Sequence, residues 1–366
     1  MTQALHALTN KGLLVLPHVR VQNANAISSP LTHGFPSITA FLGLQWALER
    51  KLVDAGIDSL FFEKVGVVCH WHEEQVSDGF VKTFRLTRNP VDKDGSTAAI
   101  VEEGRIHLDI SLVFQVGVAE DAAENPLGAD LAVRQALAWK IRDLLSTMRI
   151  AGGSVIHHKP QPGQFITPSL ILMDADAQKR AEQFRLLRRR LLPGFALVGR
   201  DDLLAQRLTQ LQAQDANATT LDAWLDLARF NWRSHEKPLA DGKTKIVWSH
   251  DRPKDAGWLV PIPVGYGALS ELYEPGQVAN ARDGETPLRF VESLYSVGQW
   301  VSPHRMDNIS DLLWWADSQP ERGLYRARSS YVPPEPEPDA PETAHAPDDN
   351  GESESSLTNA ATAASH

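Results

Sequence analysis

The sequence has little cysteine: Cys69 is the single one among 366 residues. One cysteine excludes an internal disulfide and a metal site built from several thiolates, and such usage is typical of proteins that fold in a reducing compartment. Cys69 lies within an apolar run, so we expect a small buried side chain rather than a reactive thiol. We therefore expect a cytoplasmic location.

Long hydrophobic runs are also missing, since no stretch approaches the roughly 18 to 20 apolar residues that span a bilayer. The apolar run Leu13 to Leu16 is too short for the core of a signal peptide. It has no basic leader, and Pro17 follows it in place of a small-residue cleavage site. We expect no membrane association and no secretion.

Recognisable catalytic and cofactor motifs are absent as well. The sequence contains no G-x-S-x-G and no phosphate-binding GxxxxGK[ST], and the pair Gly152-Gly153 is too short for a dinucleotide fingerprint. The run HWHEE at residues 70–74 brings two imidazoles together, but no further Cys or His at ligand spacing completes a metal site. We expect no catalytic residue, no metal and no cofactor.

The formal net charge is −10, and its distribution matters more than its size. Eight of the 46 acidic residues lie in residues 333–366, which contain no Lys or Arg, and this leaves 38 acids against 36 bases elsewhere. The rest of the chain is therefore nearly neutral, so local basic patches can govern its surface. Rich in Pro, Glu, Asp, Ala and Ser, residues 333–366 are expected to form a disordered acidic tail.

Hydrophobic periodicity in the first 160 residues predicts strands and helices in alternation. Ser37 is a suitable N-cap for a helix whose stripe contains Phe41, Leu44, Leu48 and Leu52. A second helix is predicted at residues 130–148, and strands are predicted at residues 13–23, 61–69, 80–88, 105–116 and 150–156. This order is that of a ferredoxin-like or RNA-recognition-motif-like (βαββαβ) core of the α+β class. In such a sheet the face opposite the helices is expected to be open, with the polar row His107, Asp109 and Ser111 upon it.

The second half is expected to be a helical and mixed extension over residues 161–332, packed on a core of residues 1–160. Helices are predicted at residues 175–192, 201–214 and 219–231, and a last one at residues 307–317 that carries Trp314 and Trp315. Apolar segments follow at residues 258–266 and 289–300, and residues 234–255 are polar enough to predict a long surface loop.

RNA binding has the strongest support among the functions considered. Residues 179–190 contain six bases, with Arg185, Arg188 and Arg189 on the face opposite Phe184 and Leu187. The alternative, a solvated face paired with acids elsewhere, is about equally compatible with the pattern. Further candidates offer amide, hydroxyl or guanidinium groups, or a glycine turn, to RNA: Arg20, Asn23, Asn25, Ser28, Arg85, Arg88, Asn89, Gly152, Gly153, Arg282 and Arg289. Capping, turn formation and structural salt bridges are the alternative roles for these residues.

Particular strings resemble a known family. They are QNANAISSPLTHGFPS (22–37), LTRNP with DGSTAAIVEEGR (86–105), RRLLPGFALV (189–198), GWLVPIP (257–263), ARDGETPLRFVE (281–292), and SPHR with SDLLWW (302–315). As a set they resemble the "Csy-two" subunits of type I-F CRISPR Csy (Cascade) surveillance complexes, from about Lys11 to Arg328.

The resemblance implies a non-catalytic, bacterial, cytoplasmic subunit of antiviral defence that binds the 5′ handle of the CRISPR RNA. It implies as partners the large Csy subunit, the first backbone Csy subunit, and target double-stranded DNA near its flanking motif. Two alternatives stay open. One is an endoribonuclease that uses His18, His107 or Lys82 as acid and base, and the other is a purely structural adaptor.

Overall fold

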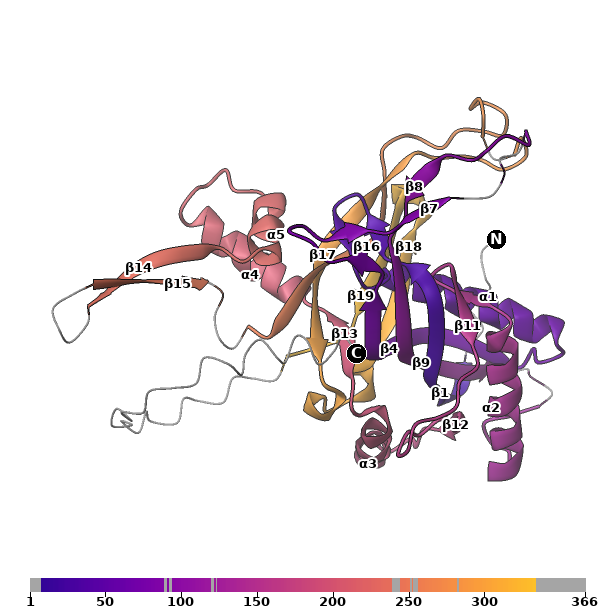
Figure 1. Ribbon diagram of the computed structural model, residues 1–366. Coiled ribbons are helices and arrows are strands. Elements are labelled where there is room, and N and C mark those ends of the chain that lie inside the picture. Colours follow the sequence, from indigo (N-terminus) through magenta and orange to yellow (C-terminus); the bar gives the residue numbers. More distant parts are fainter. Residues whose placement is uncertain are drawn as a thin grey trace.

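The computed structural model describes residues 8–88, 91, 94–119, 122, 124–238, 244–250, 252, 256–281 and 283–333. Within these residues eleven strands form one antiparallel sheet, and helices pack on both of its faces (Figure 1). The expected mixture of α and β structure is confirmed. The described part contains no helix long and apolar enough to cross a membrane.

The first half of the sheet is built from strands β1 (Leu8–Asn25), β4 (Leu60–Glu74), β9 (Arg105–Ala119) and β11 (Gly153–Ile156). They lie in the order β11-β1-β9-β4, with every neighbouring pair antiparallel. Helix α1 (Ile38–Asp54) connects β1 to β4, and α2 (Leu131–Ser146) follows β9. Two short strands complete this half: β10 (Arg149–Ile150) pairs with β11, and β12 (Ser169–Leu172) pairs with β1.

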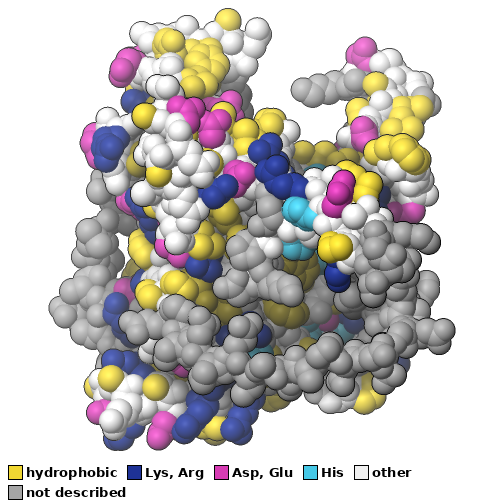
Figure 2. All heavy atoms as spheres, turned by 90° about the vertical axis from the view of Figure 1, so that its left-hand side faces the viewer, with side chains coloured by type: hydrophobic (Ala, Val, Ile, Leu, Met, Phe, Trp, Pro, Cys, Tyr) yellow, Lys and Arg dark blue, Asp and Glu magenta, His cyan; other side chains and the backbone are white. Residues whose placement is uncertain are grey.

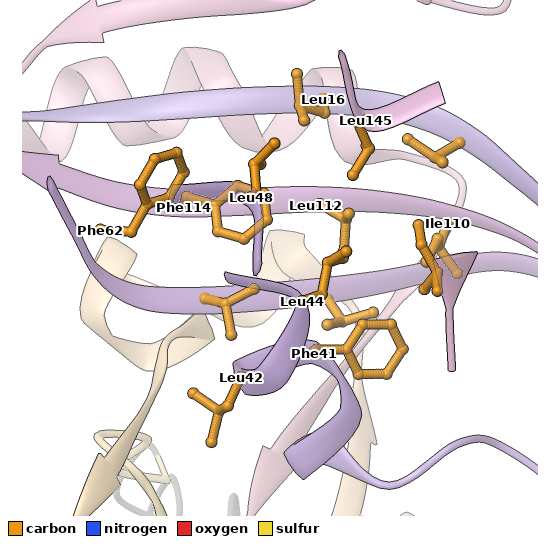
Figure 3. Packing of buried hydrophobic residues seen from close by; sticks show 14 of the residues in the cluster. Leu16, Phe41, Leu42, Leu44, Leu48, Phe62, Ile110, Leu112, Phe114 and Leu145 are labelled. Atoms are coloured by element: carbon orange, nitrogen blue, oxygen red, sulfur yellow. The ribbon is translucent and has the colours of Figure 1, made fainter. Parts of the chain in front are cut away.

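The predicted helices and alternating strand meet in the main core. Ser37 caps α1 through its side chain, which accepts a hydrogen bond from the Thr39 backbone N–H. Three side chains of α1 (Phe41, Leu44, Leu48) lie against three of β9 (Ile110, Leu112, Phe114), all at most 4% exposed (Figure 3). Because each such side chain contributes about 1.5–3 kcal/mol when fully buried, this face fixes the register of β9.

The opposite face of the sheet is not open, as the sequence analysis expected, but partly covered. Helix α3 (Ala177–Arg188) and the following 3₁₀ turn η1 (Arg189–Leu191) place Phe184 and Leu187 against Leu13, Val15 and Val113. Further along the same face Asp109 is 4% exposed and Ser111 is fully buried. The expected polar row therefore faces the protein interior over this part of the sheet.

The second half contributes strands as well as helices. Five of its strands join the sheet: β13 (Phe195–Gly199), β16 (Trp258–Ala268), β17 (Val291–Val301), β18 (Trp314–Gln319) and β19 (Leu324–Ser329). Two helices, α4 (Asp201–Gln212) and α5 (Thr220–Ala228), pack against β17 and β16. The pairings run β4-β13-β17-β16-β19-β18 and return to β4 at Trp314 and Val65. These strands therefore form a closed ring that includes β4.

Three local predictions are wrong. The helix predicted at residues 307–317 is the short turn η3 (Ile309–Leu312) followed by β18, because Trp314 is buried in the ring and donates its Nε1–H to the Leu197 carbonyl at 2.8 Å. Residues 234–255 are not simply a loop, since β14 (Trp232–Pro238) pairs with β15 (Thr244–His250) in an exposed ribbon. The strand predicted at residues 80–88 is divided into β6 (Thr83–Phe84) and β7 (Leu86–Arg88), which belong to different ribbons.

The remaining elements are short. Their bounds are β2 (Ile27–Ser29), β3 (Thr32–His33), β5 (Val76–Ser77), β8 (Ile100–Glu102), η2 (Pro303–Arg305) and η4 (Pro320–Arg322). The prediction of a disordered tail falls on residues outside the described ones, except Pro333, and stays a prediction.

Candidate nucleic-acid interface

A hollow of about 540 Å³ lies where the ends of β1, β9, β10, β11 and β7 come together. Its lining is mostly polar and contains three arginines against one carboxylate. The lining residues are Gln22, Asn23, Gln75, Arg85, Leu86, Thr87, Glu103, Arg105, Arg149, Gly152 and Ser154. We call this group the end hollow.

Backbone irregularities direct residues into the end hollow. The pairing of β1 with β9 shifts register between Val21 and Ala24, and Asn23 within this bulge has a φ of 57°. Asn tolerates this left-handed conformation better than most residues, and bulges commonly redirect side chains beside functional sites. The Asn23 backbone N–H is held by the Nδ1 atom of His107 at 3.1 Å. Gly152, with a φ of 80°, forms the tight turn between β10 and β11, beside this bulge, where the Asn25 backbone N–H donates to the Ala151 carbonyl at 2.8 Å.

The charge of the end hollow is only partly balanced. Arg105 donates from Nε and Nη2 to Oε2 of Glu103, at 3.1 and 2.6 Å, and these bonds are the main reason that the pKa of Glu103 is lowered. Arg85 donates to the neutral amide of Gln75 at 2.9 Å. Arg149 is exposed and has no carboxylate partner among the described residues. Arg85 and Arg149 therefore carry positive charge that no described carboxylate balances, and guanidinium groups are chemically suited to phosphate.

The two predicted glycines have different roles. A Cβ at Gly153 would lie 2.6 Å from the Ala24 backbone N and 2.7 Å from Cγ1 of Val21, whereas one at Gly152 would meet nothing within 4 Å. We expect Gly153→Ala to lower the free energy of unfolding by about 3 kcal/mol through overpacking. Gly152→Ala should cost only about 1 kcal/mol through its positive φ. Urea unfolding of both variants measures the difference, and equal losses would contradict this assignment.

Two other candidates in this region have local structural roles. The Asn25 side chain accepts from the Ile27 N–H at 3.1 Å and donates to the Ile27 carbonyl at 2.7 Å, which closes a turn. The Ser28 hydroxyl donates to the Phe35 carbonyl at 3.3 Å. Neither residue lines the end hollow. These contacts agree with the turn-forming alternative, and the RNA-binding role predicted for both residues stays a prediction.

The predicted arginines of α3 lie far from the end hollow. Val15 pairs with Val113 beside the α3 cluster and Asn23 bonds His107 at the hollow, so six residues of β9, roughly 20 Å at about 3.3 Å per residue, separate the two sites. Arg188 does not share the exposed surface of Arg185 and Arg189, because its Nη1 atom donates to the carbonyls of His304 and Met306, at 3.1 and 2.7 Å. The predicted residues thus form two separate cationic regions.

Other candidates lie elsewhere or outside the described residues. Arg289 donates to the Pro320 carbonyl at 3.1 Å and has a structural contact there. Asn89 and Arg282 lie outside the described residues, and for Arg88 only the backbone is described, in β7. Their predicted roles remain untested.

A buried polar cluster occupies the face of the sheet between the two cationic regions. His18 shares a hydrogen bond with Asp109 at 3.0 Å, and its ring stacks on His70 with centroids 4.1 Å apart. His70 is bound at Nδ1 by the Pro193 carbonyl and at Nε2 by the Ser111 hydroxyl, at 2.6 and 2.7 Å. Arg20 belongs to this cluster rather than to the end hollow, with its Nε atom 3.8 Å from Oδ2 of Asp109.

Burial determines how this cluster titrates. Burial lowers the pKa of His70, and it also lowers the pKa of His72. Burial raises the pKa of Asp109, but the hydrogen bond from His18 and the nearby positive charges outweigh it, so the pKa of that carboxyl is lowered. Burial likewise raises the pKa of the Cys69 thiol to about 12, which confirms the expected inert buried cysteine.

We expect acidification to destabilise the protein below about pH 6.5. An unfolded histidine has a pKa near 6.5, so as the pH falls the unfolded chain takes up a proton before folded His70 does. The free energy of unfolding then decreases by up to about 1.4 kcal/mol per pH unit. His70→Gln should therefore flatten the stability profile between about pH 6.5 and 5, although His72 maintains part of the slope. Urea unfolding at several pH values tests this, with His235→Gln on exposed β14 as the control. An unchanged slope in His70→Gln would refute it.

The structure also shows that sequence reasoning missed residues of the end hollow. Arg105 begins β9, Arg149 lies just before the predicted glycine turn, and Gln75 follows β4. The register pairs Asn25 with Arg105, and Gln22 with Ser154. Pairing the predicted strands end to end would have brought these residues together. The residues that flank them in the sequence form no motif that marks a binding site.

The described residues include neither a metal-binding group nor a hydrogen bond or ion pair that joins the nuclease candidates to one another. The described residues contain no group of three or more His, Cys, Asp or Glu side chains placed to hold a metal ion. The nuclease candidates have separate surroundings: His18 is buried against Asp109, His107 accepts from the Asn23 backbone, and Lys82 lies 3.4 Å from Asp78. These contacts do not bring the three side chains into one site.

Comparison with known proteins gives the class of this protein, which is that of the CRISPR-associated proteins. A family model described as "CRISPR-associated protein (Cas_Csy2)" matches residues 14–327. The protein "CRISPR-associated protein Csy2" of Pseudomonas aeruginosa (strain UCBPP-PA14) is 48% identical over 329 residues, which cover 86% of this chain and 94% of that protein. The chain belongs to the Csy2 family, and the resemblance found in its sequence strings is confirmed.

Proposed function

We propose that this protein is a non-catalytic subunit of a type I-F Csy surveillance complex and that its end hollow binds the 5′ handle of the CRISPR RNA. Membership of the Csy2 family supports the assignment to a CRISPR complex. The order β11-β1-β9-β4, with α1 and α2 on one face, supports a ferredoxin-like core of the RNA-recognition type over residues 1–160. Residues 161–332 would then be the extension packed upon it.

The end hollow is the observation that carries this proposal. Arg85 and Arg149 offer charge that no described carboxylate neutralises, which suits a phosphate backbone. Gln22, Asn23 and Ser154 offer hydrogen-bonding groups that suit exposed base edges and 2′-hydroxyls. Single-stranded RNA presents all of these groups at once.

The same proposal includes the partners that the sequence resemblance implies. They are the large Csy subunit, the first backbone Csy subunit, and target double-stranded DNA near its flanking motif, in the bacterial cytoplasm. Guide pairing would supply sequence specificity, while this chain would hold the guide through its backbone and shape.

Photocrosslinking tests the proposed handle site. A handle RNA with 4-thiouridine at successive positions is irradiated with the purified protein, and crosslinked peptides are identified by mass spectrometry. We expect crosslinks to the segments that contain Arg85 and Arg149, with no cleavage of the RNA. Crosslinks confined to other surfaces would refute the handle site, absence of any crosslink would favour the structural adaptor, and a site-specific cut would favour the endoribonuclease.

A further inference from the structure

Helix α3 presents a strongly cationic surface that the end hollow does not include. The segment Ala177–Leu191, formed by α3 and η1, contains six bases and one acid. Its Arg185 side chain is 59% exposed and lies 3.9 Å from Glu182, while Arg189 is exposed with no carboxylate partner in the described part of the chain. Figure 2 shows Lys and Arg side chains gathered along the lower margin of the molecule, the level at which α3 lies in Figure 1.

The neighbouring turn η2 extends this surface. Arg188 links α3 to η2 by donating to the His304 and Met306 carbonyls, and Arg305 of η2 is exposed. We call the surface formed by Arg185, Arg189 and Arg305 the α3 cationic face.

The described chain ends beside this face. After β19 the Tyr331 ring packs on the cluster that holds Phe184, Leu187 and Leu191 of α3 and η1. Burial raises the pKa of the Tyr331 hydroxyl. The positive charges of Arg200 and Arg305 oppose that rise, and the carboxylates of Asp311 and Asp202 add to it. Tyr331 thus places the start of the C-terminal segment on the cluster that α3 shares with the sheet, within range of the Arg305 charge and outside the end hollow.

The segment that follows has the complementary charge. Residues 334–366 contain eight acids and no Lys or Arg. A chain of 33 freely jointed residues has a root-mean-square span of about 30 Å. Tethering gives such a segment an effective concentration in the millimolar range, so weak ion pairs suffice for occupancy. Polymeric nucleic acid has the same charge but lacks this tether.

We propose that the acidic segment 334–366 docks on the α3 cationic face of its own chain and shields it from nucleic acid. The contact restricts polyanion binding to the end hollow, because the second cationic region is already occupied. It is electrostatic, so rising salt weakens it. The inference concerns a surface separate from the proposed handle site and does not depend on that site.

Binding of a polyuridylate 20-mer, measured by fluorescence anisotropy at about 50 mM salt, tests the proposal. We expect the chain truncated after Pro333 to bind about tenfold more tightly than the full chain. The gain should vanish when Arg185→Glu and Arg189→Glu are combined with the truncation. A full-length variant in which the eight acids become Asn or Gln should behave like the truncated chain, and one with the same acids in shuffled order should behave like the full chain.

A direct contact measurement accompanies the binding assay. In a full-length Arg189→Lys variant, the new amine should form zero-length carbodiimide crosslinks to tail carboxylates, and about 1 M salt should abolish them. Equal affinity of full and truncated chains would overturn the proposal, as would a gain that persists after charge reversal of α3. Loss of handle crosslinks at the end hollow would instead count against the proposed function and leave this contact intact.

Discussion

Replacing Arg85 and Arg149 together by alanine is expected to weaken binding of the handle RNA by about 100-fold at physiological salt. Charge-assisted hydrogen bonds contribute about 1.5–3 kcal/mol each, and roughly 3 kcal/mol for the pair corresponds to that factor. Both guanidinium groups line the end hollow, and neither has a described carboxylate partner. Fluorescence anisotropy with a labelled handle RNA measures the change.

The salt dependence of this binding distinguishes phosphate contacts from a folding defect. Each lost phosphate contact should reduce the steepness of log affinity against log salt by about 0.7. The slope of the double variant should therefore be shallower by about 1.4. Arg50→Ala with Arg229→Ala removes the same charge from exposed positions outside the hollow and should bind like the parent. If this control loses as much affinity as the hollow variant, general charge and not the hollow governs binding.

Asp109→Ala is expected to lower the free energy of unfolding by about 3–5 kcal/mol. The Asp109 side chain is 5% exposed, shares a hydrogen bond with His18 at 3.0 Å and accepts another from Gln164 at 3.2 Å. Removing the carboxylate leaves these buried polar groups without their partner and Arg20 without its nearest counter-charge. Urea unfolding near pH 7 measures the loss.

Two further variants show whether the buried hydrogen bonds of Asp109 cause the loss of stability. Asp109→Asn retains an acceptor of similar shape and should lose less stability than Asp109→Ala. Asp143→Ala removes a carboxylate from the exposed surface of α2 and should change stability by less than about 0.5 kcal/mol. A loss below about 1 kcal/mol for Asp109→Ala would show that the buried cluster stabilises the fold little.

Local sequence patterns predicted several elements of the first half of the fold. The stripe of α1, its Ser37 cap and the alternation of β9 are properties of neighbouring residues, and each has the predicted structure. The strand β18 was mistaken for a helix because its conformation depends on pairing with β19 and β4, far away in the sequence. The ribbon β14–β15 was missed because all of its described residues are exposed, so no burial alternation marks it.

In the candidate site, too, some residues were found from local sequence and others depend on contacts between distant parts of the chain. Asn23, Arg85 and Gly152 were singled out by residue type and lie together in the end hollow. Arg105 and Arg149 complete it but were missed, because residue type gives no sign of them and only the pairing of the strands brings them there. Arg20 and Arg188 have the expected charge, yet they are engaged by Asp109 and by backbone carbonyls, and residue type does not reveal such partners.

The strand ring that closes on β4 has a consequence for synthesis. On a ribosome β4 emerges more than a hundred residues before β13 and about 240 before β18, the two strands that complete its pairing. Until then its Val65 and Val68 backbone groups lack those neighbours in the growing polypeptide, and an unpaired strand edge invites association with other chains. A nascent fragment that stops before residue 195 should therefore recruit chaperones or aggregate, and the two halves should be recovered together far more readily than apart.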